Sequence, residues 1–314
     1  MDIDGHKSKD YSDAPSDYSG RVLTHEAIRF VDTSTSEHQD QPFFLYYAPV
    51  APHASGACGE VQLCTPVPDP RDTGRFSGIP PWRPPSYGKE DHVADKPAYI
   101  RKRAWDAAMT KTVDTFRERQ LEALRGVDRN IHELLSHLPS NTLIVFMSDN
   151  GFLWGEHRYA GKVVPYEESI RIPLVIRWAG SIPEGTTDPR LALNVDLAPA
   201  FLEAAGLDPT TPTGIDPSGD VRAPEGESLW SSVMRDDFVV EHADGHSGVP
   251  AYCGVRTAEG WIFVEYTTNE EELYDTGKDP LEETNLASAD PGMVASLKTE
   301  ARALCSPTPP GFSW

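Results

Sequence analysis

The sequence is poor in positive charge. Among its 314 residues, 28 Lys and Arg stand against 49 Asp and Glu, which gives a formal net charge of −21. This balance argues against a general nucleic-acid-binding protein, because such proteins present Lys and Arg to the phosphates. It also argues against electrostatic docking to anionic membranes. An anionic ligand would therefore need local Lys or Arg side chains, or a metal cation, at its binding site.

Long apolar runs, abundant cysteine and common catalytic motifs are absent as well. No run of 18 apolar residues occurs, so no membrane span is expected, and the opening MDIDGHKSKDYSD is not a signal peptide. The four cysteines, Cys58, Cys64, Cys253 and Cys305, contain no C-x-x-C pair that would indicate zinc or redox chemistry. Cys58 and Cys64 are close enough in sequence to pair, and four unpaired thiols are an equal alternative. Without a G-x-S-x-G elbow or a P-loop, a serine hydrolase and an NTPase are unsupported.

Alternating helical and strand-like patterns are present. Short apolar runs predict buried strands, and spacings of three and four predict amphipathic helices. The predicted strands are Phe43–Tyr47, Leu143–Met147 and Ile172–Trp178, and the predicted helices are Arg21–Val31, Ala104–Leu138 and Val195–Ala205. Residues 54–100 are rich in proline and predict a long loop, which we interpret as a lid or a wall of a substrate cleft. This alternation predicts an α/β fold.

The pattern changes after a Pro-, Gly- and Asp-rich stretch at residues 207–226. Short antiparallel strands are predicted at Phe238–Glu241, Tyr252–Thr257 and Trp261–Tyr266, followed by a helix at Met293–Leu304. We therefore predict one domain over residues 1–226 and a small α+β subdomain over residues 227–314.

Polar side chains follow the predicted strand Leu143–Met147. Asp149, Asn150 and Gly151 stand at its carboxyl end, where open α/β sheets bind their ligands. Carboxylate and amide oxygens suit Ca²⁺, and Mg²⁺ is the alternative metal. A strand-terminal Asp-Asn-Gly turn without metal is a competing interpretation.

Four further side chains are candidates for the same site. Lys162 could hold a doubly charged oxyanion such as sulfate or phosphate, and His53, after the strand Phe43–Tyr47, could protonate a leaving oxygen. His157 and Arg158 could reach a substrate. Each has a plainer alternative, namely a solvated lysine, a loop histidine, or an ion pair between Glu156 and Arg158.

The ordered combination of these segments resembles type I sulfatases. SDNGFLWGEHRYAGKVVPYEESIRIPLVIRWAG is similar to the metal-and-lysine segment of that family, especially the branch of N-acetylglucosamine-6-sulfatases. PFFLYYAPVAPH resembles the family's strand with a catalytic histidine, and NVDLAPAFLEAAG and ELYDTGKDPLEETNLA resemble later landmarks. The resemblance covers most of the chain.

The resemblance implies an α/β fold of the alkaline phosphatase superfamily: a sandwich with a mainly parallel sheet, incomplete here, and a carboxyl-terminal α+β subdomain with antiparallel strands. It implies hydrolysis of sulfuric esters of sugars, of the N-acetylglucosamine-6-sulfate kind. In the family, a cysteine oxidised to formylglycine attacks sulfur. Asp149 and Asn150 would be Ca²⁺ ligands, Lys162 and His53 catalytic residues, and His157 and Arg158 substrate contacts. It also implies an extracellular or periplasmic location.

One departure from the family is large. The C-x-P-S-R motif that yields formylglycine is absent, and Cys64-Thr65-Pro66-Val67-Pro68 lacks its Ser-Arg and lies on the wrong side of His53. We therefore expect a fragment that is inactive alone, with an exposed apolar sheet surface where family strands are missing. A phosphoester or phosphonate hydrolase of the same superfamily, and a non-catalytic remnant that binds sulfated glycans, are the alternatives.

Overall fold

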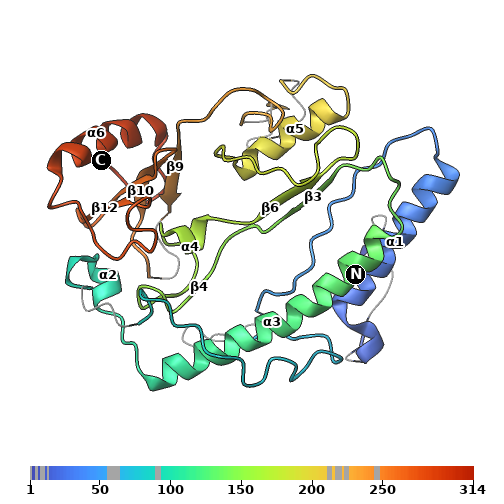
Figure 1. Cartoon of the computed structure of the whole chain (residues 1–314), viewed down its shortest axis with the longest axis horizontal. Coiled ribbons are helices and arrows are strands. Elements are labelled where there is room, and N and C mark those ends of the chain that lie inside the picture. Colours follow the sequence, from blue (N-terminus) through green and yellow to red (C-terminus); the bar gives the residue numbers. More distant parts are fainter. Residues whose placement is uncertain are drawn as a thin grey trace. The chain divides into compact units, whose positions relative to one another are not determined.

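The structure is a computed structural model (Figure 1). It describes residues 2–3, 6–7, 11–12, 14–54, 64–88, 93–210, 214–215, 221–222, 226–243 and 248–314. The chain divides into two compact units. Unit 1 comprises Met1–Pro84, Ala104–Val145 and Val175–Pro183, and unit 2 comprises Pro85–Arg103, Phe146–Leu174 and Glu184–Trp314. The proposed domain boundary at residue 226 adjoins residues outside the described ranges and stays a prediction.

Two long helices form the core of unit 1. Helices α1 (Ser19–Glu37) and α3 (Ala107–Leu135) confirm the two helices predicted at these places, and Asp106 caps α3 by accepting a hydrogen bond from the Met109 amide at 2.8 Å. Ala27, Val31 and Leu134 form their buried contact. The apolar stripes at helical spacing thus become the interface between the helices.

Residues 43–50 run against these helices in an extended course. Phe43, Leu45 and Tyr47 pack on the helical core, whereas Tyr46 is 81 % and Val50 is 65 % exposed. The predicted buried strand Phe43–Tyr47 is therefore wrong, because no described strand pairs with it to form a ladder.

Strands β3 (Ile144–Met147) and β6 (Leu174–Arg177) confirm the two strands predicted on either side of the charged loop. They form a two-stranded sheet (Figure 1). A mainly parallel central sheet is not seen in the described part of the chain, so that part of the fold prediction is corrected. The physical reason is that a larger sheet needs further strands as ladder partners, and residues 43–50 do not supply one.

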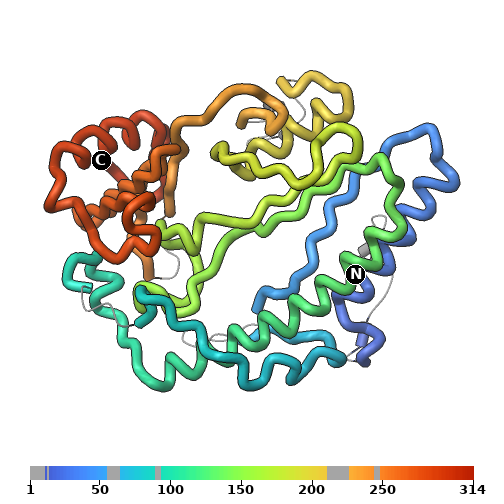
Figure 2. The backbone as a smooth tube through the Cα atoms, in the orientation of Figure 1, coloured from blue at the N-terminus to red at the C-terminus, as the bar shows by residue number. Residues whose placement is uncertain are grey.

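An antiparallel sheet organises unit 2, as the sequence predicted. Its strand order is β12 (Glu271–Asp275), β11 (Trp261–Tyr266), β10 (Tyr252–Thr257) and β9 (Asp237–His242). Helix α6 (Pro291–Leu304) covers one face through Val294, Leu297 and Ala301. Figure 2 follows the backbone from β9 to α6 in orange and red. Strand β12 was missed by the sequence analysis.

The opposite face of this sheet carries the candidate site. Alternate residues of β10, β11 and β12 point away from α6, including Tyr252, Val264 and Tyr274, and they pack on Leu153 and Tyr166. Leu153 and Tyr166, which follow β3 in the chain, are thus packed on the buried face of the four-stranded sheet opposite α6.

The remaining elements are short. They are β1 (Asp2–Ile3), β2 (His6–Lys7), η1 (Pro15–Asp17), η2 (Val93–Asp95), α2 (Ala98–Arg101), β4 (Leu153–Trp154), β5 (Ala160–Gly161), α4 (Glu167–Ile170), η3 (Asn194–Asp196), α5 (Leu197–Ala204), β7 (Gly214–Ile215) and β8 (Val221–Arg222). Helix α5 was predicted, with Gly206 as its stop in the left-handed region at φ 74°. Among the described residues, no helix is both long and apolar enough to cross a membrane.

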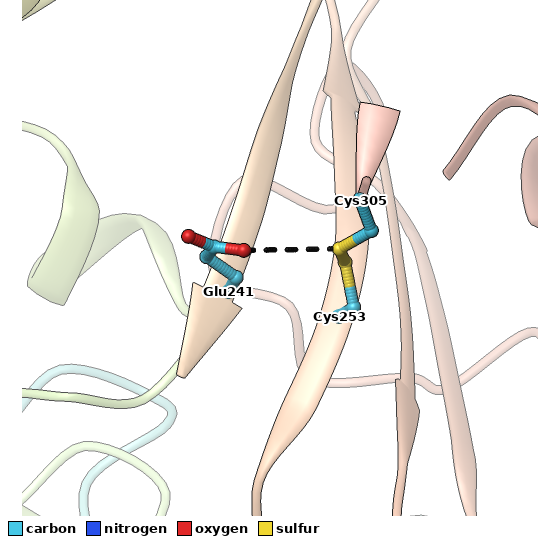
Figure 3. Close-up of a disulfide and its surroundings, with 3 residues drawn as sticks. All are labelled: Glu241, Cys253 and Cys305. Atoms are coloured by element: carbon cyan, nitrogen blue, oxygen red, sulfur yellow. Dashed lines mark hydrogen bonds between the residues drawn. A yellow bond between two sulfur atoms is a disulfide. The ribbon is translucent and has the colours of Figure 1, made fainter. Parts of the chain in front are cut away.

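The three cysteines that the structure describes, Cys64, Cys253 and Cys305, are disulfide-bonded. Cys253 on β10 forms a disulfide with Cys305, which follows α6, and Figure 3 shows the Glu241 carboxylate beside it. Cys64 is also disulfide-bonded, which excludes four unpaired thiols, whereas Cys58 lies outside the described residues. The first disulfide ties the carboxyl-terminal helix to the central sheet of unit 2.

Candidate active site

The Asp-Asn-Gly segment after β3 meets Lys162. The Lys162 Nζ atom donates a hydrogen bond to Asn150 Oδ1 at 2.5 Å, and Asn150 Nδ2 donates to the Gly151 main-chain oxygen at 2.8 Å. Asp149 is exposed. This contact brings two residues that are twelve positions apart in the sequence into one site.

A short hairpin brings Lys162 back to Asn150. Strands β4 and β5 pair antiparallel, with Leu153 opposite Gly161. The backbone at both neighbours of Lys162 has positive φ, 133° at Gly161 and 71° at Val163. A β-branched residue is rarely found in that region, and such strain is concentrated at functional sites.

Gly151 is held against helix α4. Its amide donates to the Ser169 main-chain oxygen at 2.9 Å. A Cβ atom at this position would lie 2.1 Å from the main-chain oxygen of Glu168. Only glycine permits this approach, so α4 fixes the position of the segment that carries Asp149 and Asn150.

Helix α4 is in turn anchored by residues more than 85 positions further along the chain. The Glu167 amide donates to Glu282 Oε2 at 2.8 Å, and Arg256 Nε donates to the Glu167 carboxylate at 2.8 Å. Both side chains of the Arg256–Glu167 pair are mostly buried, 13 % and 17 % exposed. The candidate site is thus built on the carboxyl-terminal sheet of unit 2.

His157 lies inside the unit. Its side chain is fully buried and stacks on Tyr166 with ring centroids 4.0 Å apart, and its Nε2 atom lies 3.9 Å from Glu168 Oε2. The neighbouring Arg158 is half-buried and donates from Nε to the Gly88 main-chain oxygen at 3.3 Å. As placed, His157 faces protein groups, and the predicted substrate contacts of both residues stay predictions.

Two buried carboxyl groups accompany His157. Burial raises the pKa of Glu168 and raises the pKa of Glu282 well above its ordinary value. Sequence reasoning missed both residues, since glutamate is rarely buried. The only available signals were the runs PYEES and DPLEETN, which we used as family landmarks and not as sites.

A second polar network lies beneath the site. The buried Glu272 carboxylate accepts hydrogen bonds from the hydroxyl groups of Tyr166 at 2.8 Å and Tyr274 at 2.5 Å, and also from Tyr266. The buried Lys96 ammonium donates to the Tyr274 hydroxyl at 2.8 Å. Burial raises the pKa of each of the three tyrosines well above the usual value, so all three stay protonated donors and hold the support rigid.

His53 belongs to unit 1. It is exposed, and its Nδ1 atom lies 2.9 Å from the Ala54 main-chain oxygen. Its approach to Lys162 and Asn150, which belong to unit 2, stays a prediction.

The donor set fits part of a calcium site. Asp149 offers a carboxylate, and Asn150 offers the amide oxygen that already faces an ammonium group. Ca²⁺ takes about six to eight oxygen ligands, so these two residues supply a minority of them. Formylglycine does not fit this chain, because no C-x-P-S-R motif is present and Cys64 is disulfide-bonded.

Two family models match the chain. The model described as "Sulfatase" matches residues 2–207, and the model described as "N-sulphoglucosamine sulphohydrolase, C-terminal" matches residues 155–304.

Curated relatives carry related names. An arylsulfatase of Volvox carteri is 29 % identical over 333 residues, covering 92 % of this chain and 50 % of the relative. An N-acetylglucosamine-6-O-sulfatase of Bacteroides thetaiotaomicron is 35 % identical over 175 residues, covering 53 % of this chain and 31 % of the relative. An extracellular sulfatase homologue of Drosophila melanogaster is 27 % identical over 221 residues, covering 66 % and 18 %. The chain spans about half the length, or less, of each of these relatives.

Solved structures share the fold. A protein solved with its substrate D-glucosamine-2-N,6-O-disulfate has a TM-score of 0.68 at 22 % identity, covering 92 % of this chain and 69 % of that chain. A phosphonate monoester hydrolase of Silicibacter pomeroyi also has a TM-score of 0.68 at 22 % identity, covering 93 % and 60 %. The family model over residues 2–207 confirms the resemblance, and the solved structures agree with it in fold: the chain belongs to the sulfatase family.

Proposed function

We propose that this chain carries the metal- and sulfate-binding part of a sulfatase that acts on sulfated sugars of the N-acetylglucosamine-6-sulfate kind. The contact between Lys162 Nζ and Asn150 Oδ1, at 2.5 Å, is the observation that carries the proposal. It puts a lysine beside an oxygen donor in a chain whose overall charge of −21 would otherwise repel sulfate. The Bacteroides thetaiotaomicron relative supports the choice of sugar.

Each residue has a distinct role in this proposal. Asp149 and Asn150 hold Ca²⁺, with Mg²⁺ as the alternative, and the bound cation would neutralise charge on the sulfate oxygens. Lys162 binds a sulfate oxygen as a point charge and stabilises the leaving oxygen. His53 donates a proton to that leaving oxygen. Arg158 contacts the sugar. The burial of His157 argues against a direct contact with the substrate.

The nucleophile has no candidate in this chain, because the C-x-P-S-R motif is absent from all 314 residues. We therefore propose that the chain alone hydrolyses sulfate esters negligibly and that turnover needs further polypeptide to supply a nucleophile and the remaining cation ligands.

Binding tests the proposal without requiring turnover. In calorimetry with Ca²⁺, N-acetylglucosamine-6-sulfate should bind the purified chain more tightly than N-acetylglucosamine. Lys162→Ala should weaken binding at least about tenfold, which corresponds to about 1.4 kcal/mol, whereas Lys111→Ala, at an exposed position on α3, should not. Equal binding of the two sugars, or no effect of Lys162→Ala, would contradict the proposal.

A phosphoester or phosphonate hydrolase is the second candidate, because the Silicibacter pomeroyi enzyme matches the fold as well as the sugar-disulfate-bound protein does. Phenylphosphonate would then compete with the sulfated sugar for the chain. The third candidate is a non-catalytic remnant that binds sulfated glycan. In that case the chain should bind the glycan, and no turnover should appear when further sulfatase polypeptide is supplied.

We propose that the protein is exported from the cytosol. The disulfide between Cys253 and Cys305 supports it, since disulfides persist mainly in oxidising compartments. Detection of reduced thiols at both positions in protein isolated under thiol-blocking conditions would argue against this location.

A further inference from the structure

Three ligand-type side chains, none of them part of the proposed calcium site, converge inside unit 2. His157, Glu168 and Glu282 each offer one atom, and these three atoms all lie within 4.8 Å of one another. The two carboxyl groups come from segments more than one hundred residues apart, α4 and the loop after β12. The tertiary fold therefore brings the two carboxyl groups together, since they are not neighbours in the sequence.

This convergence is unusual because it is buried. Glu282 is fully buried, and its Oε1 atom has no hydrogen-bond partner in the described part of the chain. The same holds for Glu168 Oε2, on a side chain that is 20 % exposed. Buried carboxylate oxygens are almost always hydrogen-bonded or bound to a cation, so two that point at one histidine call for a ligand.

The geometry suits a small divalent cation. Zinc binds histidine nitrogen and carboxylate oxygen at about 2.0–2.1 Å in a tetrahedron, which sets neighbouring donors roughly 3.3–3.4 Å apart. His157 Nε2 and Glu168 Oε2 are 3.9 Å apart, and all three donor atoms lie within 4.8 Å of one another, so side-chain movements of about 0.5–1.5 Å would bring the donors to the spacing of a zinc site.

The surroundings orient two of the donors. Tyr166 stacks on the His157 ring with an interplanar angle of 20° and fixes its plane. Glu282 Oε2 accepts the Glu167 amide at 2.8 Å, which leaves Oε1 for a cation. Such outer contacts are typical of metal ligands.

We propose that His157, Glu168 and Glu282 bind a divalent transition metal ion of the zinc type, at a site separate from the calcium position proposed at Asp149 and Asn150. Two ionised carboxylates match the charge of such an ion. The ammonium group of Lys96, which donates to the main-chain oxygen of Glu282, opposes a cation, so both carboxylates must be ionised to hold one. A water molecule would occupy the fourth position.

A bound ion would fix α4, because it joins Glu168 on the helix to Glu282. Since the Gly151 amide donates to the Ser169 main-chain oxygen of α4, the ion would also steady the Asp-Asn-Gly segment. The proposed role is structural, and it does not depend on hydrolysis of any ester.

Zinc binding to the full chain, tag-free and freed of metal with a chelator, tests the proposal. Equilibrium dialysis should give one zinc ion per chain with a dissociation constant at or below the micromolar range. Glu282→Gln and His157→Gln should each weaken binding at least about tenfold. Glu283→Gln, a neighbouring carboxylate outside the cluster, and Asp149→Asn should leave it unchanged. Cobalt in place of zinc should give visible absorption bands of a four-coordinate site, lost in His157→Gln.

Several outcomes would overturn the proposal. These are the absence of stoichiometric zinc on the unmodified chain, retention of zinc by both cluster variants, and loss of zinc on Asp149→Asn alone. If Glu282→Gln fails to fold, as circular dichroism would reveal, His157→Gln and the cobalt spectrum of the unmodified chain still decide the question. Zinc binding without sulfated-sugar binding would leave this inference standing and remove the proposed function.

Discussion

Gly151 is the position where one methyl group should do the most damage to the candidate site. In Gly151→Ala the new Cβ atom would lie 2.1 Å from the Glu168 main-chain oxygen and 2.9 Å from its carbon. An unstrained C···O contact is about 3.3 Å, so the segment or helix α4 must move by about 1 Å. Both groups are backbone, and no flexible side chain can yield instead.

The cost can be worked from three terms. Overpacking costs about 1–3 kcal/mol. Loss of the hydrogen bond from the Gly151 amide to Ser169 adds about 1 kcal/mol. The stiffer unfolded chain of the alanine variant returns about 0.4–1 kcal/mol. The net loss of unfolding free energy is therefore about 1–3.5 kcal/mol, and the same movement should separate Asn150 from Lys162.

Urea unfolding of the purified variant measures this loss, with Gly292→Ala as the matched control. Gly292 lies in helix α6, and a Cβ there would meet only Asp290 Oδ1, at an ordinary 3.5 Å. Alanine should stabilise that helix by about 0.5–1 kcal/mol. A Gly151→Ala variant that loses less than about 0.5 kcal/mol would refute the close approach to α4.

Two further predictions concern stability. Replacing both Cys253 and Cys305 by Ser opens a loop with a sequence separation of 52, and chain entropy gives a loss of about 4 kcal/mol, measurable by urea unfolding; an unchanged midpoint would contradict it. Burial alone would raise the pKa of the Asp69 carboxyl group, but hydrogen bonds from Arg21 at 2.7 Å and Arg71 at 2.8 Å outweigh it and hold this pKa well below its ordinary value. The stabilisation by the ionised Asp69 carboxylate is then complete above about pH 4 and is lost as the pH falls through the lowered pKa. Asp69→Asn should therefore be less stable at pH 7, and it should lose less stability between about pH 4 and pH 2 than the unmodified chain. Parallel pH profiles of unfolding free energy for the two proteins would contradict this prediction.

Local features were predictable from the sequence. Helices α1 and α3 follow from apolar residues at helical spacing, which a short window contains in full. The hairpin of β10 and β11 follows from its strand runs and its turn for the same reason. The family resemblance assigned Asn150 and Lys162 to one site, and Lys162 Nζ lies 2.5 Å from Asn150 Oδ1, whereas the proposed roles of both residues stay predictions.

Non-local features were not predictable. Residues 43–47 have strand-like composition, yet a strand also needs partners, and sequence composition does not say whether partners exist. The burial of Glu282 depends on the fold of unit 2, because its carboxylate meets α4 more than one hundred residues earlier in the chain. A glutamate in a polar run gives no local sign of such a contact.

Hydrolysis of an aryl sulfate tests the central claim most directly. The purified chain, produced together with a formylglycine-generating enzyme and assayed with Ca²⁺, should show no hydrolysis above background, because the roles proposed for Asp149, Asn150 and Lys162 are to bind and not to attack. Turnover should require a second polypeptide, namely the segment of a sulfatase relative that lies outside the match to this chain and carries the C-x-P-S-R motif. Robust Ca²⁺-dependent hydrolysis by the chain alone would contradict the account.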